Sequence, residues 1–133
     1  MKYLFVFLLL GLMVSCGDDA SGDAAKTKET KTDKYSTVKI DNLEVMTKNL
    51  GEMNWDEAVK ACSALGDEWR LPSKDELNLL YLNKDEIGGF ADKFYWSSEV
   101  VGNVNAWVQG FYIGLQLPNS KDGNASVRPV RAI

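Results

Sequence analysis

Two capping-box sequences constrain the fold of this chain more than any other feature. In each, a residue that caps helices stands three positions before a glutamate: Asn54 before Glu57, and Ser73 before Glu76. The cap side chain accepts a hydrogen bond from the glutamate N–H, and the glutamate side chain reaches back to the cap N–H. The sequence therefore predicts two short helices, the first of which runs to about residue 65 and stops at Gly66.

Apolar and polar residues alternate in the segments before and after the two predicted helices. We expect strands over residues 36–46 (one strand, or two around a turn at residues 41–42), 105–117 and 125–133, and a loop over residues 83–92. This arrangement predicts an α+β fold with two short helices packed on a small antiparallel sheet. The helix residues expected to face the core are Trp55, Val59, Cys62, Leu65, Leu77, Leu80 and Tyr81.

An apolar run occupies residues 3–14, after Lys2 and before Ser15 and Cys16. It is too short to span a bilayer as a helix. The stretch resembles a bacterial lipoprotein signal, in which the cysteine sulfur receives a diacylglyceryl group, the peptide is cut before the cysteine, and the new amine is acylated. The resemblance implies a signal peptide over residues 1–15 and a stable anchor in the lipid bilayer at Cys16. An ordinary secretory signal and a short membrane anchor are the alternatives.

The segment after the expected anchor is polar. Between residues 17 and 37 its only large apolar residue is Tyr35, so we expect a disordered tether over residues 16–37 and a folded domain over residues 38–133. An aspartate directly after the lipidated cysteine resembles an inner-membrane retention signal, but this chain has Gly17 at that position. The next two residues, Asp18-Asp19, resemble an acidic export tag of surface lipoproteins. We therefore expect a lipid-anchored protein of the bacterial outer membrane, with exposure on the cell surface as an open alternative.

The charge of the folded part limits its partners. Residues 38–133 carry ten Lys or Arg and fourteen Asp or Glu, a net charge of −4. An acidic domain without a basic run argues against binding of nucleic acid and other polyanions.

The residues needed for common catalytic sites are missing. The chain has no histidine, which excludes Ser–His and Cys–His sites and histidine-ligated metals. If Cys16 is lipidated, Cys62 has no intrachain partner, and it is expected in the core. The acidic doublets at the helix starts are explained by the helix dipole. We expect no enzyme activity, cofactor or metal, although two distant carboxylates leave glycoside processing as a third possibility.

Three stretches follow one another along the chain. The first is Asn54-Trp55-Asp56-Glu57-Ala58 with Cys62 downstream, and the second is Trp69-Arg70-Leu71-Pro72-Ser73 followed by Glu76-Leu77 and Leu80-Tyr81. The third is Tyr95-Trp96-Ser97-Ser98, then Asn105-Ala106-Trp107, then Val127-Arg128-Pro129-Val130-Arg131. In this order they resemble the Fibrobacter succinogenes major paralogous domain and the related C-terminal domain of the Legionella collagen-like protein. The resemblance implies a C-type-lectin-like fold, and for the second relative glycosaminoglycan-type ligands. Its motif residues are expected to build the scaffold, with the arginines paired to carboxylates or loop carbonyls. They are Trp55, Trp69, Arg70, Leu71, Pro72, Trp96, Ser97, Ser98, Trp107, Arg128 and Arg131.

Calcium-dependent sugar binding is not expected. Lectins of this fold often carry Glu-Pro-Asn or Gln-Pro-Asp followed by Trp-Asn-Asp, whereas residues 116–119 read Gln-Leu-Pro-Asn and no Trp-Asn-Asp follows. Residues 122–124 lack the spacing of a calcium loop and indicate a turn.

A binding surface is the remaining hypothesis. If Trp107 and Phe111 face the core, Tyr112 points outward, and Tyr95 is expected to do so from its own strand. Exposed aromatic rings beside amides suit stacking on a glycan or packing on an envelope protein. We therefore expect a non-catalytic display domain, with a structural component of an envelope complex as the alternative. The candidate ligand-binding residues are Tyr112, Tyr95, Asn103, Asn105, Gln116, Asn119 and Asn124.

Overall fold

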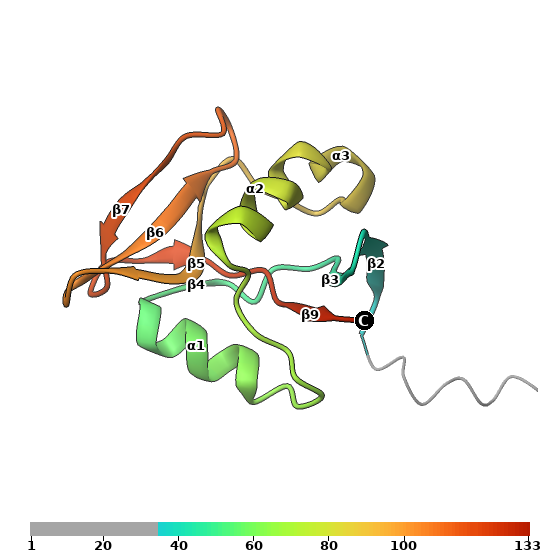
Figure 1. Ribbon diagram of the computed structural model, residues 1–133, viewed down its shortest axis with the longest axis horizontal. Helices are drawn as coiled ribbons and strands as arrows, with labels where there is room; N and C mark the ends of the chain where they lie inside the picture. Colours follow the sequence, from blue (N-terminus) through green and yellow to red (C-terminus); the bar gives the residue numbers. More distant parts are fainter. Residues whose placement is uncertain (1–34) are drawn as a thin grey trace, which may run out of the picture. The chain divides into compact units, whose positions relative to one another are not determined.

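The computed structural model describes residues 35–133, so the expected signal peptide, Cys16 and residues 17–34 of the expected tether lie outside the described part. Residues Ser36–Ile133 form one compact unit. Its elements follow one another in the order shown in Figure 1. They are β2 (Thr37–Ile40), β3 (Leu43–Met46), β4 (Glu52–Met53), α1 (Trp55–Ser63), α2 (Lys74–Leu82), α3 (Lys84–Ile87), β5 (Phe94–Val101), β6 (Asn105–Gly110), β7 (Gln116–Ser120), β8 (Ala125–Ser126) and β9 (Val130–Ala132).

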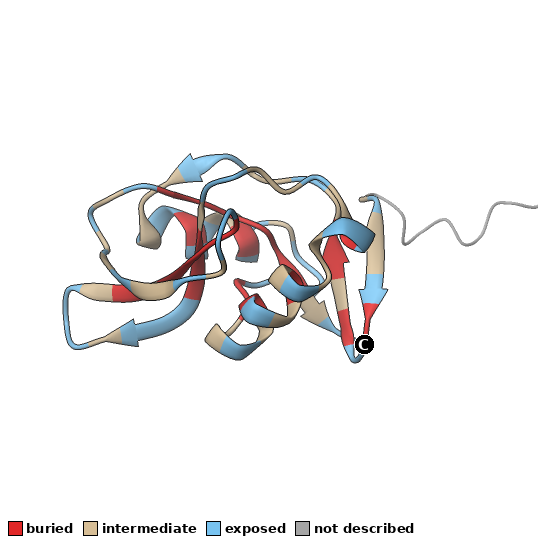
Figure 2. Cartoon of the chain, turned by 90° about the horizontal axis from the view of Figure 1, so that it is seen from above, coloured by how far each residue is buried: buried red, intermediate tan, exposed pale blue. Residues whose placement is uncertain are grey.

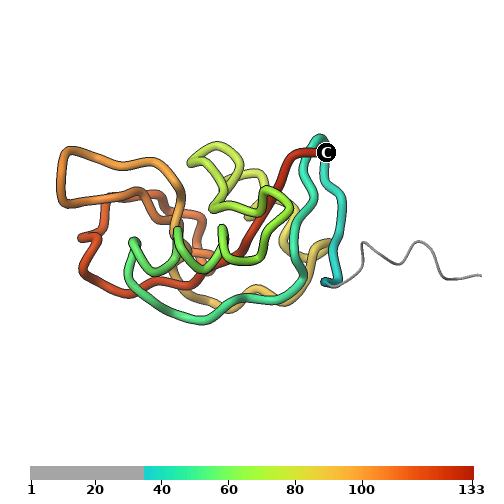
Figure 3. Tube along the Cα trace, turned by 90° about the horizontal axis from the view of Figure 1, so that it is seen from below, coloured from blue at the N-terminus to red at the C-terminus, as the bar shows by residue number. Residues whose placement is uncertain are grey.

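The strands that the structure describes form two sheets. One has the order β2-β3-β9 and the other the order β4-β8-β5-β6-β7. All pairings are antiparallel except that of β5 with β8, which is parallel. The sheet β2-β3-β9 lies at one end of the unit, and the turn between β5 and β6 lies at the other end (Figures 1 and 3). The predicted α+β class is confirmed, with one parallel pair that the sequence pattern did not indicate.

Both capping boxes are formed. The Asn54 side chain accepts a hydrogen bond from the Glu57 N–H (2.9 Å), and the Asn54 N–H donates to the Glu57 carboxylate (3.2 Å). Ser73 and Glu76 make the same pair of bonds at 3.1 and 2.9 Å. Because these bonds satisfy N–H groups that have no partner within the helix, each box sets the start of its helix.

The five-stranded sheet is covered on both faces. Tyr95 of β5 packs with Leu77 and Leu80 of α2. The next residue, Trp96, packs with Ala58 and Cys62 of α1. Successive residues of a strand point to opposite faces, so α1 and α2 cover opposite faces of this sheet. Figure 2 shows buried residues in the middle of the unit and in the sheet β2-β3-β9 at its end, and exposed residues along the turns and the outer helix faces.

The face of α1 that is buried contains Ala58 in place of the predicted Val59. Ala58 and Cys62 are buried, whereas Val59 is 38 % exposed and Trp55 and Leu65 are partly buried. The small side chains of Ala58 and Cys62 let the helix approach the sheet closely. The pair at positions i and i+4 therefore replaces the larger valine in the core.

Three predicted spans are divided in the structure. The expected loop 83–92 contains the helix α3. The expected strand 105–117 ends at Gly110, turns, and resumes at Gln116 as β7. The expected last strand is broken between β8 and β9 by residues that include Pro129, which cannot donate to a sheet.

Candidate functional site

The loop between β6 and β7 carries three exposed apolar side chains. Tyr112 is 49 % exposed, Ile113 59 % and Leu115 50 %. We call these three residues the hairpin tip. The predicted exposure of Tyr112 is confirmed. Neighbouring large apolar side chains that remain in water are typical of a contact surface.

The hairpin tip is held in one conformation by several contacts. The Gly110 N–H donates to the Leu115 carbonyl (2.8 Å), and the Gly114 N–H donates to the Gly110 carbonyl (2.7 Å). Gly114 has a φ of +82°, and a Cβ at this position would lie 2.6 Å from the Tyr81 ring of α2. The Gln109 side-chain amide also donates to the Gly114 carbonyl (3.0 Å). A loop fixed in this way loses little conformational freedom when it binds.

Phe111 connects the hairpin tip to the core. Its ring stacks on that of Phe90 at 4.5 Å between centroids and meets the Tyr81 ring edge to face at 5.6 Å. On the other side of the strand, Tyr112 meets Phe94 at 5.7 Å and 86°. Packed aromatic rings therefore support the exposed hairpin tip from below.

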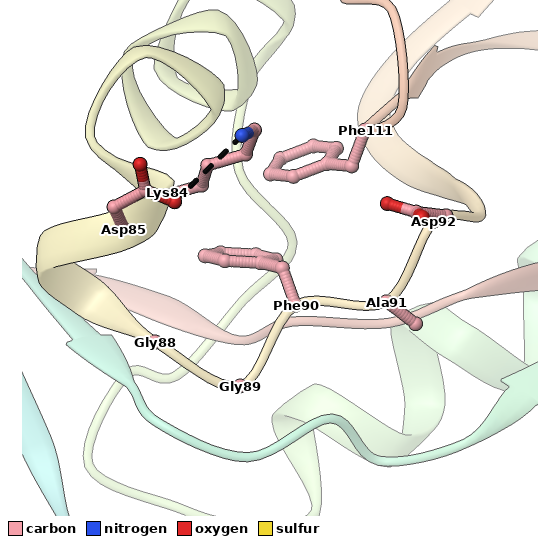
Figure 4. A pocket seen from close by; sticks show the side chains of 8 residues that line it. All are labelled: Lys84, Asp85, Gly88, Gly89, Phe90, Ala91, Asp92 and Phe111. Atoms are coloured by element: carbon pink, nitrogen blue, oxygen red, sulfur yellow. Dashed lines mark ion pairs between the residues drawn. The ribbon is translucent and has the colours of Figure 1, made fainter.

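A cavity of about 280 Å³ lies beside Phe111 (Figure 4). Its volume is just below the usual range of small-ligand sites. The ring of Phe90 faces that of Phe111, and the Lys84 ammonium lies beside them and is paired with Asp85 at 3.8 Å. The cavity thus combines aromatic surface with one cation and two carboxylates. Its lining residues are Lys84, Asp85, Gly88, Gly89, Phe90, Ala91, Asp92 and Phe111.

Arg128 supports the wall of this cavity from behind. Its guanidinium is fully buried and donates to the carbonyls of Met46 (2.9 Å) and Gly88 (3.0 Å) and to the Asn49 side chain (2.9 Å). It also lies 3.9 Å from the centre of the Phe90 ring. Burial lowers the pKa of Arg128 to about 10. Within the described part of the chain, its Nη2 atom has no hydrogen-bond partner.

The other two motif arginines make ion pairs within the fold. Arg70 binds both carboxylate oxygens of Glu76 (2.7 and 3.1 Å), which raises the pKa of Arg70 and lowers that of Glu76. Arg131 donates to Glu44 at 2.8 Å and lies 4.7 Å from the Trp69 ring. All three arginines therefore bond as expected, to carboxylates or loop carbonyls.

The remaining motif residues build the scaffold to different degrees. Trp69, Leu71, Pro72, Trp96 and Ser97 are buried, Trp55 and Trp107 are partly buried, and Ser98 is exposed. Two tryptophans also donate their ring N–H groups to carbonyls. These bonds join Trp55 to Ser97 (2.9 Å) and Trp96 to Met53 (2.8 Å).

The predicted exposure of Tyr95 is wrong. The side chain is fully buried against Phe111 at 4.6 Å, and its hydroxyl accepts a hydrogen bond from the Ala91 N–H (2.9 Å). The prediction assumed a sheet with one face in water. Because α1 and α2 cover opposite faces, neighbouring residues of β5 are both buried.

The predicted ligand-binding amides do not surround Tyr112. Gln116 is near it, but its amide is used within the fold, where it donates to the Lys74 carbonyl (2.9 Å) and to Gln109 (3.2 Å). The other amides lie around the opposite end of β6, five residues from Gly110, which is about 17 Å along a strand. The structure thus divides the predicted site into two surfaces. The displaced amides belong to Asn103, Asn105, Asn119 and Asn124.

Sequence reasoning missed Ile113, Leu115 and the cavity. Two pairs of glycines are the sequence features that could have indicated them. Gly110 and Gly114 stand on either side of the tight turn, and Gly88 and Gly89, beside the cavity, both have positive φ. These glycines mark turns, but which side chains the turns expose depends on contacts with α2 and α3.

The described residues give little support for a reactive thiol, a metal site or a membrane-spanning helix. Cys62 is buried, and burial raises the pKa of its thiol to about 12. Within residues 35–133, no group of three or more acidic or cysteine side chains is placed to hold a metal ion. No helix in this part of the chain has the length and apolar character needed to cross a bilayer.

Comparison with known proteins agrees with this fold. The sequence profile of the Lcl C-terminal domain matches residues 24–131. The structure is similar to that of convulxin, a snake venom toxin, with a TM-score of 0.56 and 11 % sequence identity over 73 % of this chain and 95 % of convulxin. The similarity to convulxin shows a C-type-lectin-like fold. No curated protein sequence matches the chain.

Proposed function

Since the chain belongs to the Lcl C-terminal domain family, we propose that it is a lipid-anchored envelope protein whose lectin-like domain binds a partner without catalysis. The fold and the family support a binding or display domain in general. The contact surface that we propose is the hairpin tip, and the ligand that its chemistry favours is another protein.

The composition of the hairpin tip carries this proposal. Its only hydrogen-bonding side-chain group is the Tyr112 hydroxyl, and the rest of the exposed tip is apolar. Protein interfaces have such apolar centres surrounded by a polar rim. Lys84 and Asp92 of the neighbouring cavity would supply part of that rim. A glycan, by contrast, needs several hydrogen-bonding groups at the point of contact.

The attachment of the domain is compatible with display. The expected anchor at Cys16 precedes β2, which belongs to the sheet β2-β3-β9 at one end of the unit. The hairpin tip belongs to the other sheet (Figure 1). A partner could therefore reach the tip while the β2 end faces the membrane.

The absence of catalysis is supported by composition and by one side chain. The chain has no histidine, and the buried Cys62 thiol, with a pKa of about 12, is a poor nucleophile at neutral pH. Lectin-like folds of this kind are typically non-catalytic.

Lipid anchoring is tested with Cys16→Ala. We expect the unchanged chain to incorporate labelled palmitate and to sediment with outer membranes, and the variant to lose both properties. Asp18→Ala with Asp19→Ala tests surface export, because protease applied to whole cells should then no longer remove the domain. A Cys16→Ala chain that still sediments with membranes would contradict the anchor.

The hairpin tip is tested by replacing Tyr112, Ile113 and Leu115 with serine. All three are exposed, so the variant should fold, and we expect loss of the adduct formed when cells are treated with a lysine-reactive cross-linker. Val100→Ser with Val104→Ser is the matched control, because these exposed apolar residues flank a different turn. An unchanged adduct in the tip variant would refute the proposal. A partner from the same envelope would indicate an assembly role, and a partner from outside the cell would indicate display.

A further inference from the structure

The strand β2 has an open side in the described part of the chain. It is an edge strand, because the sheet to which it belongs has the order β2-β3-β9. Figures 1 and 3 show it at the outside of the unit, and within residues 35–133 it pairs with β3 alone. A strand edge with unpaired N–H and carbonyl groups is a template on which another strand can pair.

The hydrogen bonds of β3 show which groups of β2 point outward. The Thr47 N–H donates to the Ser36 carbonyl (3.1 Å). Since every second residue of an antiparallel strand bonds to its neighbour, residues 36, 38 and 40 bond to β3. Thr37 and Lys39 lie between them and direct their backbone N–H and carbonyl groups away from the sheet. We call these outward groups the β2 edge.

The β2 edge is complementary to itself. Its two residues are placed symmetrically about Val38, so a second β2 can pair antiparallel on a two-fold axis at Val38. Thr37 of each copy then lies opposite Lys39 of the other, and each such pair exchanges two backbone hydrogen bonds. The two Val38 side chains meet at the axis. Val38 is partly buried against the core, and this contact covers more of its apolar surface.

The charge of Lys39 is compensated within the fold. A lysine on an edge strand can prevent pairing, but the register sets Lys39 opposite Glu44. Burial acts to raise the pKa of Glu44, but hydrogen bonds from Thr37 and Arg131 and the charges of both cations lower it. Arg131 also lies 4.0 Å from the Asp67 carboxylate. Two acids therefore balance two bases, and the β2 edge carries no excess charge.

We infer that β2 pairs with β2 of a second copy, so that the two sheets β2-β3-β9 become one continuous sheet. The chain that precedes β2 favours a second copy as the partner. Residues 17–34 join the expected anchor at Cys16 to this strand. In the paired form the two Thr37 residues lie two positions apart along the strands, at about 8 Å, so both segments can reach one membrane.

A few backbone hydrogen bonds hold two copies together weakly, because each bond replaces one to water. Anchoring in one membrane raises the effective concentration of the β2 edge. This step rests on the anchor proposed above, whereas the pairing itself does not. The β2 edge also differs from the hairpin tip, so either surface can fail while the other holds.

Disulfide capture in membranes tests the pairing. Val38→Cys in the full, anchored chain sets two thiols opposite each other with Cβ atoms about 4.5 Å apart, close to the separation in a disulfide. Cys62 is buried, so the unchanged chain should give no dimer. We expect a dimer from Val38→Cys after mild oxidation. Val104→Cys is the matched control, because Val104 is more exposed, at 66 %, but lies in a different turn. It should give little dimer.

Two variants at position 39 test the backbone bonds. Proline has no N–H and is tolerated in an edge strand where that group points away from the sheet. Lys39→Pro should therefore fold, as circular dichroism checks, and should abolish the dimer of Val38→Cys. Lys39→Thr removes the same charge but keeps the N–H, so it should leave the dimer unchanged.

The lipid-free chain that starts at residue 17 tests the pairing without the anchor, and it retains the compact unit Ser36–Ile133. In ¹⁵N NMR, the backbone N–H signals of Thr37 and Lys39 should shift between dilute and millimolar solutions. Those of the hairpin tip should not. Concentration-independent signals, or equal dimer from Val38→Cys and Val104→Cys in membranes, would overturn the inference. If Cys16 carries no lipid, the anchor proposal fails and the concentration dependence alone decides the pairing.

Discussion

Gly89→Ala and Gly66→Ala form a matched pair that tests how the cavity wall is built. Both glycines have nearly the same positive φ, +78° for Gly89 and +75° for Gly66. Around Gly66 nothing lies within 4 Å of the added Cβ, so alanine there costs only the left-handed backbone strain, about 1–2 kcal/mol. At Gly89 the Cβ would lie 2.2 Å from the Thr47 carbonyl oxygen and 3.1 Å from Nη2 of Arg128.

The backbone of Gly89 or Thr47 must therefore move, and the contacts of the Arg128 guanidinium move with it. Overpacking of this kind adds about 1–3 kcal/mol to the strain, so the total loss is about 2–5 kcal/mol. In a domain of this size, that lowers Tm by about 10–25 °C, against about 5–10 °C for Gly66→Ala. Thermal unfolding followed by circular dichroism measures both. Equal losses in the two variants would refute the close packing of Gly89 on Thr47.

Three further predictions concern buried and paired groups. Arg128→Met should reduce the free energy of unfolding by about 3–4 kcal/mol in urea, because carbonyls that it bonds lose their donor; an unchanged value would contradict its structural role. The bond from Arg70 lowers the pKa of Glu76 below its ordinary value of 4.5, so the stability from this carboxylate is present above that pH and is lost as pH falls. The fall in Tm below pH 4.5 should therefore be shallower in Glu76→Gln, and an identical pH profile would contradict the pairing. Because burial raises the pKa of the Cys62 thiol to about 12, it should react with iodoacetamide at pH 8 only after denaturant is added, and fast labelling of the folded chain would show that it is accessible.

The features predicted well from the sequence depend on neighbouring residues. A capping box needs only four consecutive positions, and both boxes form. The turn at residues 41–42 likewise joins β2 to β3, with Asp41 at a φ of +53°. Trp96, expected in the scaffold, is buried, because a small domain rarely leaves so large an apolar side chain in water.

The features predicted poorly depend on distant contacts. Tyr95 is buried because α1 and α2 cover both faces of β5, which the period-two pattern does not reveal. Ile113 is exposed because β6 ends at Gly110 and the chain turns back, with Gly114 of the turn packed on Tyr81. The predicted site was divided for the same reason, since Tyr112 and Asn105 stand at opposite ends of β6 rather than side by side.

The most direct test of the proposed function compares two photo-cross-linking positions in living cells. Ile113 in the hairpin tip and Val104 in the turn between β5 and β6 are similar branched apolar residues, 59 % and 66 % exposed. A photoreactive amino acid is placed at either position in the full, anchored chain. We expect a discrete adduct with one protein from position 113 and none of that mass from position 104. The same adduct from both positions, or none from position 113, would contradict binding through the hairpin tip.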